Sequence, residues 1–277
     1  MNAQGLTSVV YQISRIVGPA LAGYAIAVAS GMLGGSLRGA AVCFLINGIT
    51  YPAMVTALLL MHPKPMAARE RGSELRRKGG RGGLLAGVRY ALQSPVVLGL
   101  FALMAVQGLF LYPYTTLLPI FAKDILKVGA QGLGWLNTAV GAGALVGALI
   151  VSNLGRGRRG RIMFYFSLLM TPALVAFGLS RSFPLSLGML ALVGAGIVVI
   201  TTFASSTLLA VVPDELRGRV NSVGFMIYFG ANYGSGLPAG FAAAWIGAGP
   251  TVAIAGLLFL FSMGFIRWRF PEVIAVE

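Results

Sequence analysis

Long apolar runs dominate this chain and decide what it can fold into. Eight stretches of about 20 mostly apolar residues follow one another, and an α-helix needs that length to cross the hydrocarbon core of a bilayer. Their expected bounds are 8–29, 39–61, 95–118, 130–154, 162–180, 185–211, 220–245 and 249–268. We therefore expect an all-α polytopic membrane protein with eight transmembrane helices.

The composition supports a membrane protein and argues against other classes. Apolar residues make up 57% of the chain and charged residues 10%, whereas soluble domains carry roughly 25% charged residues. The net charge of +14 does not indicate nucleic-acid binding, because the basic residues occupy connections between apolar runs. With a single cysteine, Cys43, and a single histidine, His62, the chain has no evident metal-ligand set. We expect membrane lipid as a partner, and no nucleic acid, metal or cofactor.

The distribution of Lys and Arg predicts the topology. Of the 21 basic residues, 16 fall in the connections after the second, fourth and sixth spans and in the C-terminal tail, and 4 fall on the opposite side. Cytoplasmic loops carry the excess of Lys and Arg. We therefore expect a multi-pass protein with both termini in the cytoplasm.

The longest connection divides the chain. Residues 62–94 form a basic linker, whose last part, 84–92, is expected to be a short amphipathic helix on the inner membrane surface. Two spans precede the linker (1–61) and six follow it (95–270), before a cytoplasmic tail (271–277).

Small residues and prolines predict how the spans pack and bend. Gly141, Gly143 and Gly147, with Ala144 and Ala148, form a dense small-residue face in the fourth span, which favours close helix packing in lipid. Pro113 and Pro119 are expected to bend or break the third span near its outer end.

An internal repeat suggests the overall plan. Asn2 and Pro19 are seventeen residues apart, as are Asn221 and Pro238, and Gly5 and Gly224 fall in the same register. Equivalent helices six spans apart imply two repeats of six, a plan used by secondary transporters. On this plan residues 95–270 are a complete second half, residues 1–61 are the fifth and sixth helices of the first, and four helices are absent before Met1.

Three stretches resemble a known family: Gly18-Pro19-Ala20-Leu21-Ala22-Gly23, the charged segment from Val212 to Ser222, and the basic connection from Gly147 to Arg161. They are similar to motifs of the major facilitator superfamily permeases, in the branch of bacterial secretion-type exporters that includes enterobactin-exporter-like and macrolide-efflux-like proteins. The resemblance implies a partial major facilitator fold, equivalent to helices 5 to 12, in the cell inner membrane. The third stretch departs from the pattern, because Asn153 lies near the usual aspartate position.

The first two motifs imply gating roles. Gly18, Pro19 and Gly23 would bend a helix that closes the outer end of the path, although Ala22 stands where the family has a second glycine; a plain helix kink is the alternative. Pro213, Asp214 and Glu215 suit a helix start. Arg217 and Arg219 can reach acids or helix C-termini nearby and latch the cytoplasmic face; the alternative is charge that only sets topology.

Candidate transport-path residues are the polar side chains within the spans. Arg15 is the clear ionisable candidate, on one helix face with Tyr11 and Gly18; the alternative is that it reaches back to the inner interface. The other candidates are Gln107, Tyr112, Tyr114, Asn137, Thr201, Thr202, Tyr228 and Asn232. The resemblance places them in cavity-lining helices, and helix–helix hydrogen bonding is the alternative for each.

These features predict a secondary active transporter that exports a small siderophore-like or drug-like molecule by alternating access, as a proton-driven antiporter. None of the seven acids lies in mid-membrane, so a proton site is expected in the missing helices. One alternative is a truncated, non-transporting remnant. Another is a membrane-embedded enzyme, which is disfavoured because convergent His, Asp, Glu or Cys residues are lacking.

Overall fold

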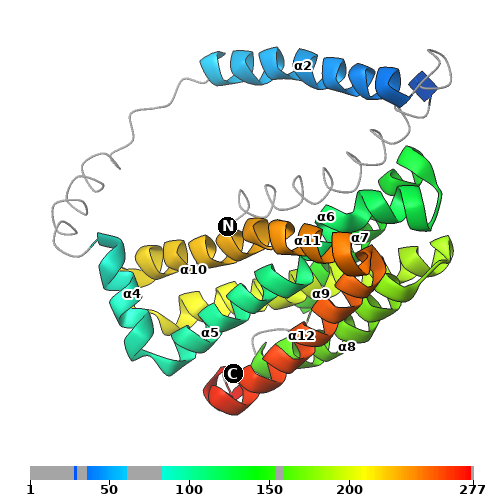
Figure 1. Cartoon of the computed structure of the whole chain (residues 1–277). Coiled ribbons are helices and arrows are strands. Elements are labelled where there is room, and N and C mark those ends of the chain that lie inside the picture. Colours follow the sequence, from blue (N-terminus) through cyan, green and yellow to red (C-terminus); the bar gives the residue numbers. More distant parts are fainter. Residues whose placement is uncertain (1–27, 30–35, 61–82, 154–158, 276–277) are drawn as a thin grey trace.

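The computed structural model describes residues 28–29, 36–60, 83–153 and 159–275 (Figure 1), and it contains helices and no strand in these ranges. The helices are α2 (Ser36–Leu60), α4 (Gly83–Gln93), α5 (Pro95–Val106), α6 (Pro113–Ile120), α7 (Gly129–Asn153), α8 (Arg159–Leu179), α9 (Phe183–Val211), α10 (Asp214–Gly234), α11 (Gly236–Ile246), α12 (Ala248–Arg269) and α13 (Pro271–Ala275), with two π-helical turns, η1 (Gln107–Leu111) and η2 (Phe121–Ile125).

Apolar helices long enough to cross a membrane confirm the polytopic prediction. Among the described residues, five segments meet that condition by length and composition: Pro95–Ile125, Gly129–Asn153, Gly160–Leu179, Phe183–Val211 and Ala248–Arg269. They match five of the expected spans. The expected span at 39–61 corresponds to α2, and the one at 220–245 to α10 and α11 together. The first expected span, apart from residues 28 and 29, lies outside the described residues.

The third span is irregular where the prolines predicted a break. The regular helix ends at Val106, continues as η1, bends at Tyr112 and restarts at Pro113. Proline has no N–H group, so Pro113 cannot close the helical hydrogen bond to the carbonyl of Leu109. A second π-helical turn, η2, follows Pro119. The predicted interruption of this span is therefore confirmed.

The seventh expected span is two helices rather than one. α10 ends at Gly234, Ser235 forms the break, and α11 begins at Gly236. Pro238 has no N–H to offer to the carbonyl of Gly234, so the ladder is interrupted one turn before the proline. α10 begins at Asp214, six residues before the expected span, with Asp214 and Glu215 in its first turn. The helix start predicted at Pro213 to Glu215 is therefore confirmed. Acidic side chains in a first turn are stabilised by the positive end of the helix dipole.

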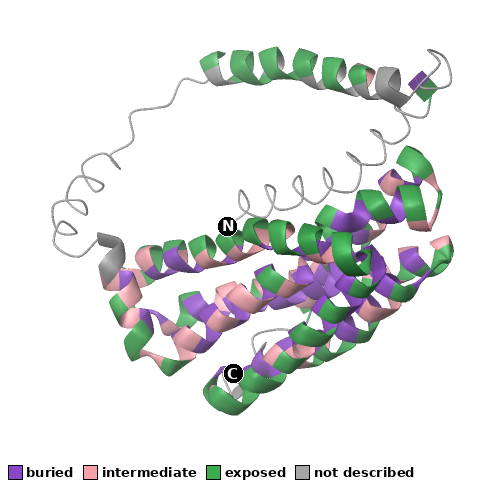
Figure 2. Ribbon diagram, in the orientation of Figure 1, coloured by how far each residue is buried: buried purple, intermediate pink, exposed green. Residues whose placement is uncertain are grey.

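α9 is the central helix of the bundle formed by α4 to α13. It contacts α7, α8, α5 and α10, and its residues Leu190, Val193 and Ile200 are completely buried. Figure 2 shows the ribbon coloured as buried along this core, with exposed residues on the outer faces of the surrounding helices. α2 lies apart from the bundle in Figure 1, and most of its described side chains are exposed.

Glycines bring α7 and α9 into backbone contact. A Cβ atom at Gly143 would collide with the carbonyl oxygen of Ala191, and one at Gly147 with that of Ala195. From the other side, a Cβ at Gly194 would collide with the carbonyl oxygen of Val140. The small-residue face predicted in the fourth span is therefore a helix-packing face, the close approach that small residues permit in membranes.

α4 lies where a short helix was expected in the linker. Its residue Gly87 lies against the backbone of Arg219 in α10, where a Cβ would come within 3.1 Å of the carbonyl oxygen. α4 also contacts α5. Contact with α10 therefore holds α4 on the bundle. The expected position of α4 on the membrane surface remains a prediction.

Substituting Gly143 tests the α7–α9 contact. Gly143→Ala places a methyl group against the Ala191 carbonyl, and overpacking of this kind costs about 1–3 kcal/mol. We expect the thermal unfolding midpoint in detergent to fall by roughly 3–10 °C. Gly188→Ala in α9 is the matched control, since no atom lies within 4 Å of its added Cβ. Equal midpoints for the two variants would contradict the packing argument.

Candidate transport path

A buried polar contact joins the third span to α9. Gln107, at the start of η1, is completely buried. Its Nε2 donates to the hydroxyl of Thr201 at 3.0 Å and to the carbonyl oxygen of Ile197 at 3.3 Å. Its Oε1 has no hydrogen-bond partner among the described residues. A buried acceptor without a donor costs free energy, so this amide is a candidate to receive a hydrogen bond from water or from a transported molecule.

A second polar contact joins the third span to α10. The hydroxyl groups of Tyr112 and Tyr228 are 2.5 Å apart, and their rings meet edge to face at 5.8 Å. Tyr112 occupies the bend before Pro113, and Tyr228 is buried in α10. Gly108 lets the helices approach, because a Cβ there would lie 2.7 Å from the Tyr228 carbonyl oxygen. We call Gln107, Thr201, Tyr112 and Tyr228 the polar cluster.

Three aromatic rings extend from the polar cluster along α10. Phe229 meets Tyr228 edge to face at 5.3 Å, and stacks on Phe225 at 6.0 Å and on Tyr233 at 6.1 Å. All three rings are exposed. Figure 2 shows the outer face of α10 uncovered by the other described helices. We call Phe225, Phe229 and Tyr233 the aromatic ladder. The prediction from sequence did not include it, although the spacing i, i+4, i+8 places the three on one helix face.

The structure brings together some predicted path residues and separates others. Asn232 lies half-buried one turn after Tyr228, and its backbone N–H faces Gly108. Tyr114 packs edge to face against Phe177 of α8. Asn137 donates to the Leu133 carbonyl within its own helix, and Thr202 is exposed beside Thr201. Tyr11 and Arg15 lie outside the described residues. The transport role of each remains a prediction.

The charged motif lies at the start of α10. Arg217 forms an ion pair with Asp214, and its Nε donates to the carbonyl oxygen of Val212 at the end of α9, at 3.2 Å. Glu215 is exposed, and the backbone of Arg219 contacts α4. The ion pair is itself exposed, so it adds little stability, but it ties the α9–α10 connection together. The gating role of Asp214, Glu215, Arg217 and Arg219 stays a prediction. Gly18, Pro19 and Gly23 lie outside the described residues.

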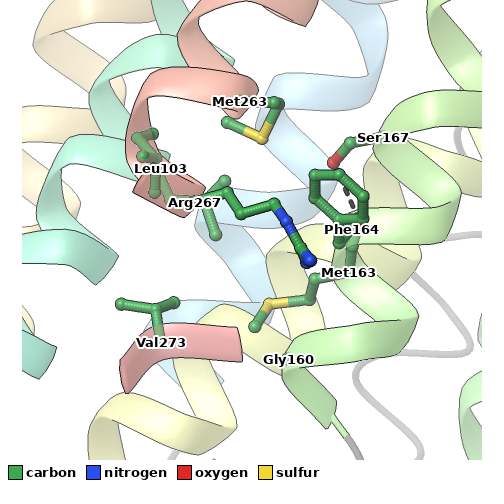
Figure 3. Close-up of a pocket in the computed structure, with 9 residues that line it drawn as sticks. Leu103, Gly160, Met163, Phe164, Ser167, Met263, Arg267 and Val273 are labelled. Carbon is green, nitrogen blue, oxygen red and sulfur yellow. Dashed lines mark hydrogen bonds between the residues drawn. The ribbon is translucent and has the colours of Figure 1, made fainter. Parts of the chain in front are cut away.

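Two hollows accompany these helices. An apolar groove of about 300 Å³ lies between η1, α6, α11 and α12, and Leu109, Pro113, Ser235 and Pro238 are among its lining residues. It includes no member of the polar cluster. A much smaller crevice lies where α5, α8, α12 and α13 meet, beside Arg267 (Figure 3).

In the described ranges no group of three or more His, Cys, Asp or Glu residues could hold a metal ion.

The comparisons with known proteins agree with this architecture. A protein family described as transmembrane secretion effector matches residues 1–276. The enterobactin exporter EntS of Shigella flexneri is 33% identical over 141 residues, which cover 50% of this chain and 32% of that protein. The enterobactin exporters EntS of Shigella boydii serotype 18 and of Escherichia coli O1:K1 are each 27% identical over 230 residues, which cover 80% of this chain and 50% of theirs. The chain therefore spans about half the length or less of these curated relatives.

A solved structure shares the fold. It is a bacterial homologue of the human lysosomal transporter Spinster, in an inward-facing and unoccupied conformation. The match has a TM-score of 0.53 and 16% identity, and covers 96% of this chain and 67% of that one. At this identity the likeness concerns the fold alone.

Together the apolar helices, the fold and the family match define a major facilitator permease of the exporter branch. The chain belongs to the transmembrane secretion effector family. This places it among membrane transporters and not among enzymes.

A double-mutant cycle tests the contact between Tyr112 and Tyr228. Either Tyr→Phe change removes the hydroxyl–hydroxyl hydrogen bond, so each lowers the free energy of unfolding by about 0.5–1.5 kcal/mol. The double variant should lose much less than the sum of the two, because the bond can be lost only once. The measurement is equilibrium unfolding in mixed micelles, with Tyr233→Phe as a control near zero. Additive losses would show that the two hydroxyls act independently.

Proposed function

We propose that this chain forms part of the path of an exporter for small amphipathic molecules. The polar cluster carries the proposal. Polar side chains inside a membrane bundle are costly and mark transport paths, and here the irregular part of the third span makes two such contacts, Gln107 with Thr201 of α9 and Tyr112 with Tyr228 of α10. Membership of the transmembrane secretion effectors supports transport, and the relatives named as enterobactin exporters support the outward direction.

The aromatic ladder supports an amphipathic cargo, siderophore-like or drug-like. Phe225 and Phe229 offer ring faces, Tyr233 offers a ring with a hydroxyl, and Tyr228 joins them to the polar cluster. A molecule with apolar rings and a few polar groups matches such a surface, since aromatic rings stack on one another and hydroxyl groups exchange hydrogen bonds. Tyr11, Arg15, Asn137 and Thr202 remain further candidates for the same path.

Alternating access is the mechanism we propose. The third span is interrupted at Tyr112 before Pro113, and α10 and α11 are interrupted at Ser235 before Pro238. These two interrupted segments contact each other, α10 through η1 and α11 through α6. Interrupted helices supply places where one part of a span can tilt against the other.

Proton coupling belongs to the same proposal. The acids among the described residues, Asp124, Asp214, Glu215 and Glu272, are all exposed at helix ends. A proton-coupling group in a membrane path is usually a buried acid or histidine whose pKa can move. We therefore place the coupling site outside the described residues.

Charge asymmetry supports an inner-membrane location with both termini in the cytoplasm. Arg161 near the start of α8, Arg217 near the start of α10 and Arg267 near the end of α12 belong to one end of the bundle, because successive spanning helices run in opposite directions. Lys123, Lys127 and Arg181 belong to the other end. The end that is richer in arginine is the expected cytoplasmic end.

Accumulation of labelled compounds in cells with and without the chain tests export. We expect cells that produce it to accumulate several-fold less of at least one ring-containing amphipathic compound from a broad panel. Phe229→Ala should abolish most of that difference, whereas Phe261→Ala, which removes a still more exposed ring on α12, should keep it.

Two outcomes would contradict the proposal. Equal accumulation across the whole panel, at confirmed membrane levels of the protein, would argue against export. Equal loss in both phenylalanine variants would argue against the ladder as a cargo surface.

A further inference from the structure

A basic patch lies at the end of the bundle where α8 begins and α12 ends. It consists of Arg161 in the first turn of α8, with Arg267 and Arg269 in the last turn of α12, and all three side chains are exposed. Figure 3 shows Arg267 reaching across from α12 toward Phe164 and Gly160 of α8. α8 and α12 pack along their lengths, with a Cβ at Gly178 only 2.8 Å from the Gly249 carbonyl oxygen near their other ends.

Aromatic rings hold two of these three guanidinium groups. Arg267 lies over the ring of Phe164 at 5.0 Å, and Arg269 over the ring of Phe270 at 5.3 Å. Within the described residues, none of the three arginines forms an ion pair. The nearest acid along the chain, Glu272, is exposed at the start of α13 and forms no ion pair with any described residue. A cation–π contact uses the face of a guanidinium and leaves its N–H groups for an acceptor.

The surroundings of the patch are those of a membrane interface. Trp268 lies between the two arginines with 77% of its surface exposed, and Phe265 one turn earlier is 57% exposed. Tyr165 of α8 is exposed on the same part of the bundle. Exposed Trp and Tyr rings gather at the level of lipid headgroups. The crevice beneath Arg267 is apolar, lined by Leu103, Met163, Met263 and Val273 among others (Figure 3).

We propose that the basic patch binds the phosphate of an anionic phospholipid, whose acyl chains lie along the apolar outer faces of α8 and α12. Guanidinium groups bind phosphate oxygens in a bidentate manner, and basic residues close to an anionic membrane surface are attracted to its negative charge. A zwitterionic headgroup fits less well, because its own ammonium would lie among three arginines that no carboxylate of the described residues neutralises. The site is independent of the transport path, since none of its residues belongs to the polar cluster or to the aromatic ladder.

Native mass spectrometry of the full chain released from detergent micelles tests the proposal. Phosphatidylglycerol and phosphatidylcholine with identical acyl chains are added at equal concentrations. We expect the lipid-bound fraction to be several-fold higher with phosphatidylglycerol. The double variant Arg267→Gln/Arg269→Gln should lose most of that preference, whereas Arg267→Lys/Arg269→Lys should retain much of it because the charge is kept.

Arg181→Gln is the matched control. Arg181 is an exposed arginine at the other end of α8, between α8 and α9, and its loss should leave the preference unchanged. Equal binding of the two lipids by the wild-type chain would overturn the proposal whatever the variants do. An undiminished preference in a folded Arg267→Gln/Arg269→Gln variant would place the lipid site elsewhere and would overturn it too.

Discussion

Backbone contact between α7 and α9 is the interaction on which the rest of this structure depends. In a bilayer no hydrophobic force draws one helix to another, so helices associate through close packing and hydrogen bonds. Gly143, Gly147 and Gly194 allow the two backbones to touch. That contact fixes α9 at the centre of the bundle, and α9 in turn presents Ile197 and Thr201 to the third span.

The polar cluster forms because the third span departs from a regular helix between Gln107 and Tyr112. The π-helical turn η1 carries Gln107 toward α9, and the bend before Pro113 carries Tyr112 toward Tyr228 in α10. Polar side chains of this kind stabilise the bundle while their partners are in place and are costly when they are not. The Oε1 of Gln107 has no hydrogen-bond partner among the described residues, and under the proposed function it is a point where a transported molecule or water would complete the network.

Sequence reasoning recovered the elements whose cause is local. The length of the apolar runs predicted the spans, and Pro113 predicted the interruption of the third one. The acids after Pro213 predicted the start of α10, and Gly143 and Gly147 predicted a packing face. It could not decide which polar side chains meet. Tyr112 and Tyr114 are expected on different faces because positions two apart on a helix do not share a face, but the sequence does not say that one contacts α10 and the other α8. A π-turn shifts the phase of the residues that follow it, so a 3.6-residue period does not carry through η1.

The expected span that contains α10 began later in the sequence than the helix itself does. Apolarity locates the part of a helix within the membrane and not the turns that precede it.

Reaction of introduced cysteines with a charged, membrane-impermeant maleimide, in permeabilised native membranes, tests the central claim most directly. The claim is that the face of α10 bearing the aromatic ladder lines a water-accessible path, while the exposed face of α12 meets lipid. In a Cys43→Ser background, which removes the single native cysteine, we expect Phe229→Cys to be labelled and Phe261→Cys to resist labelling, although both side chains are exposed in the structure. Equal labelling at the two positions, or labelling of Phe261→Cys alone, would contradict the account.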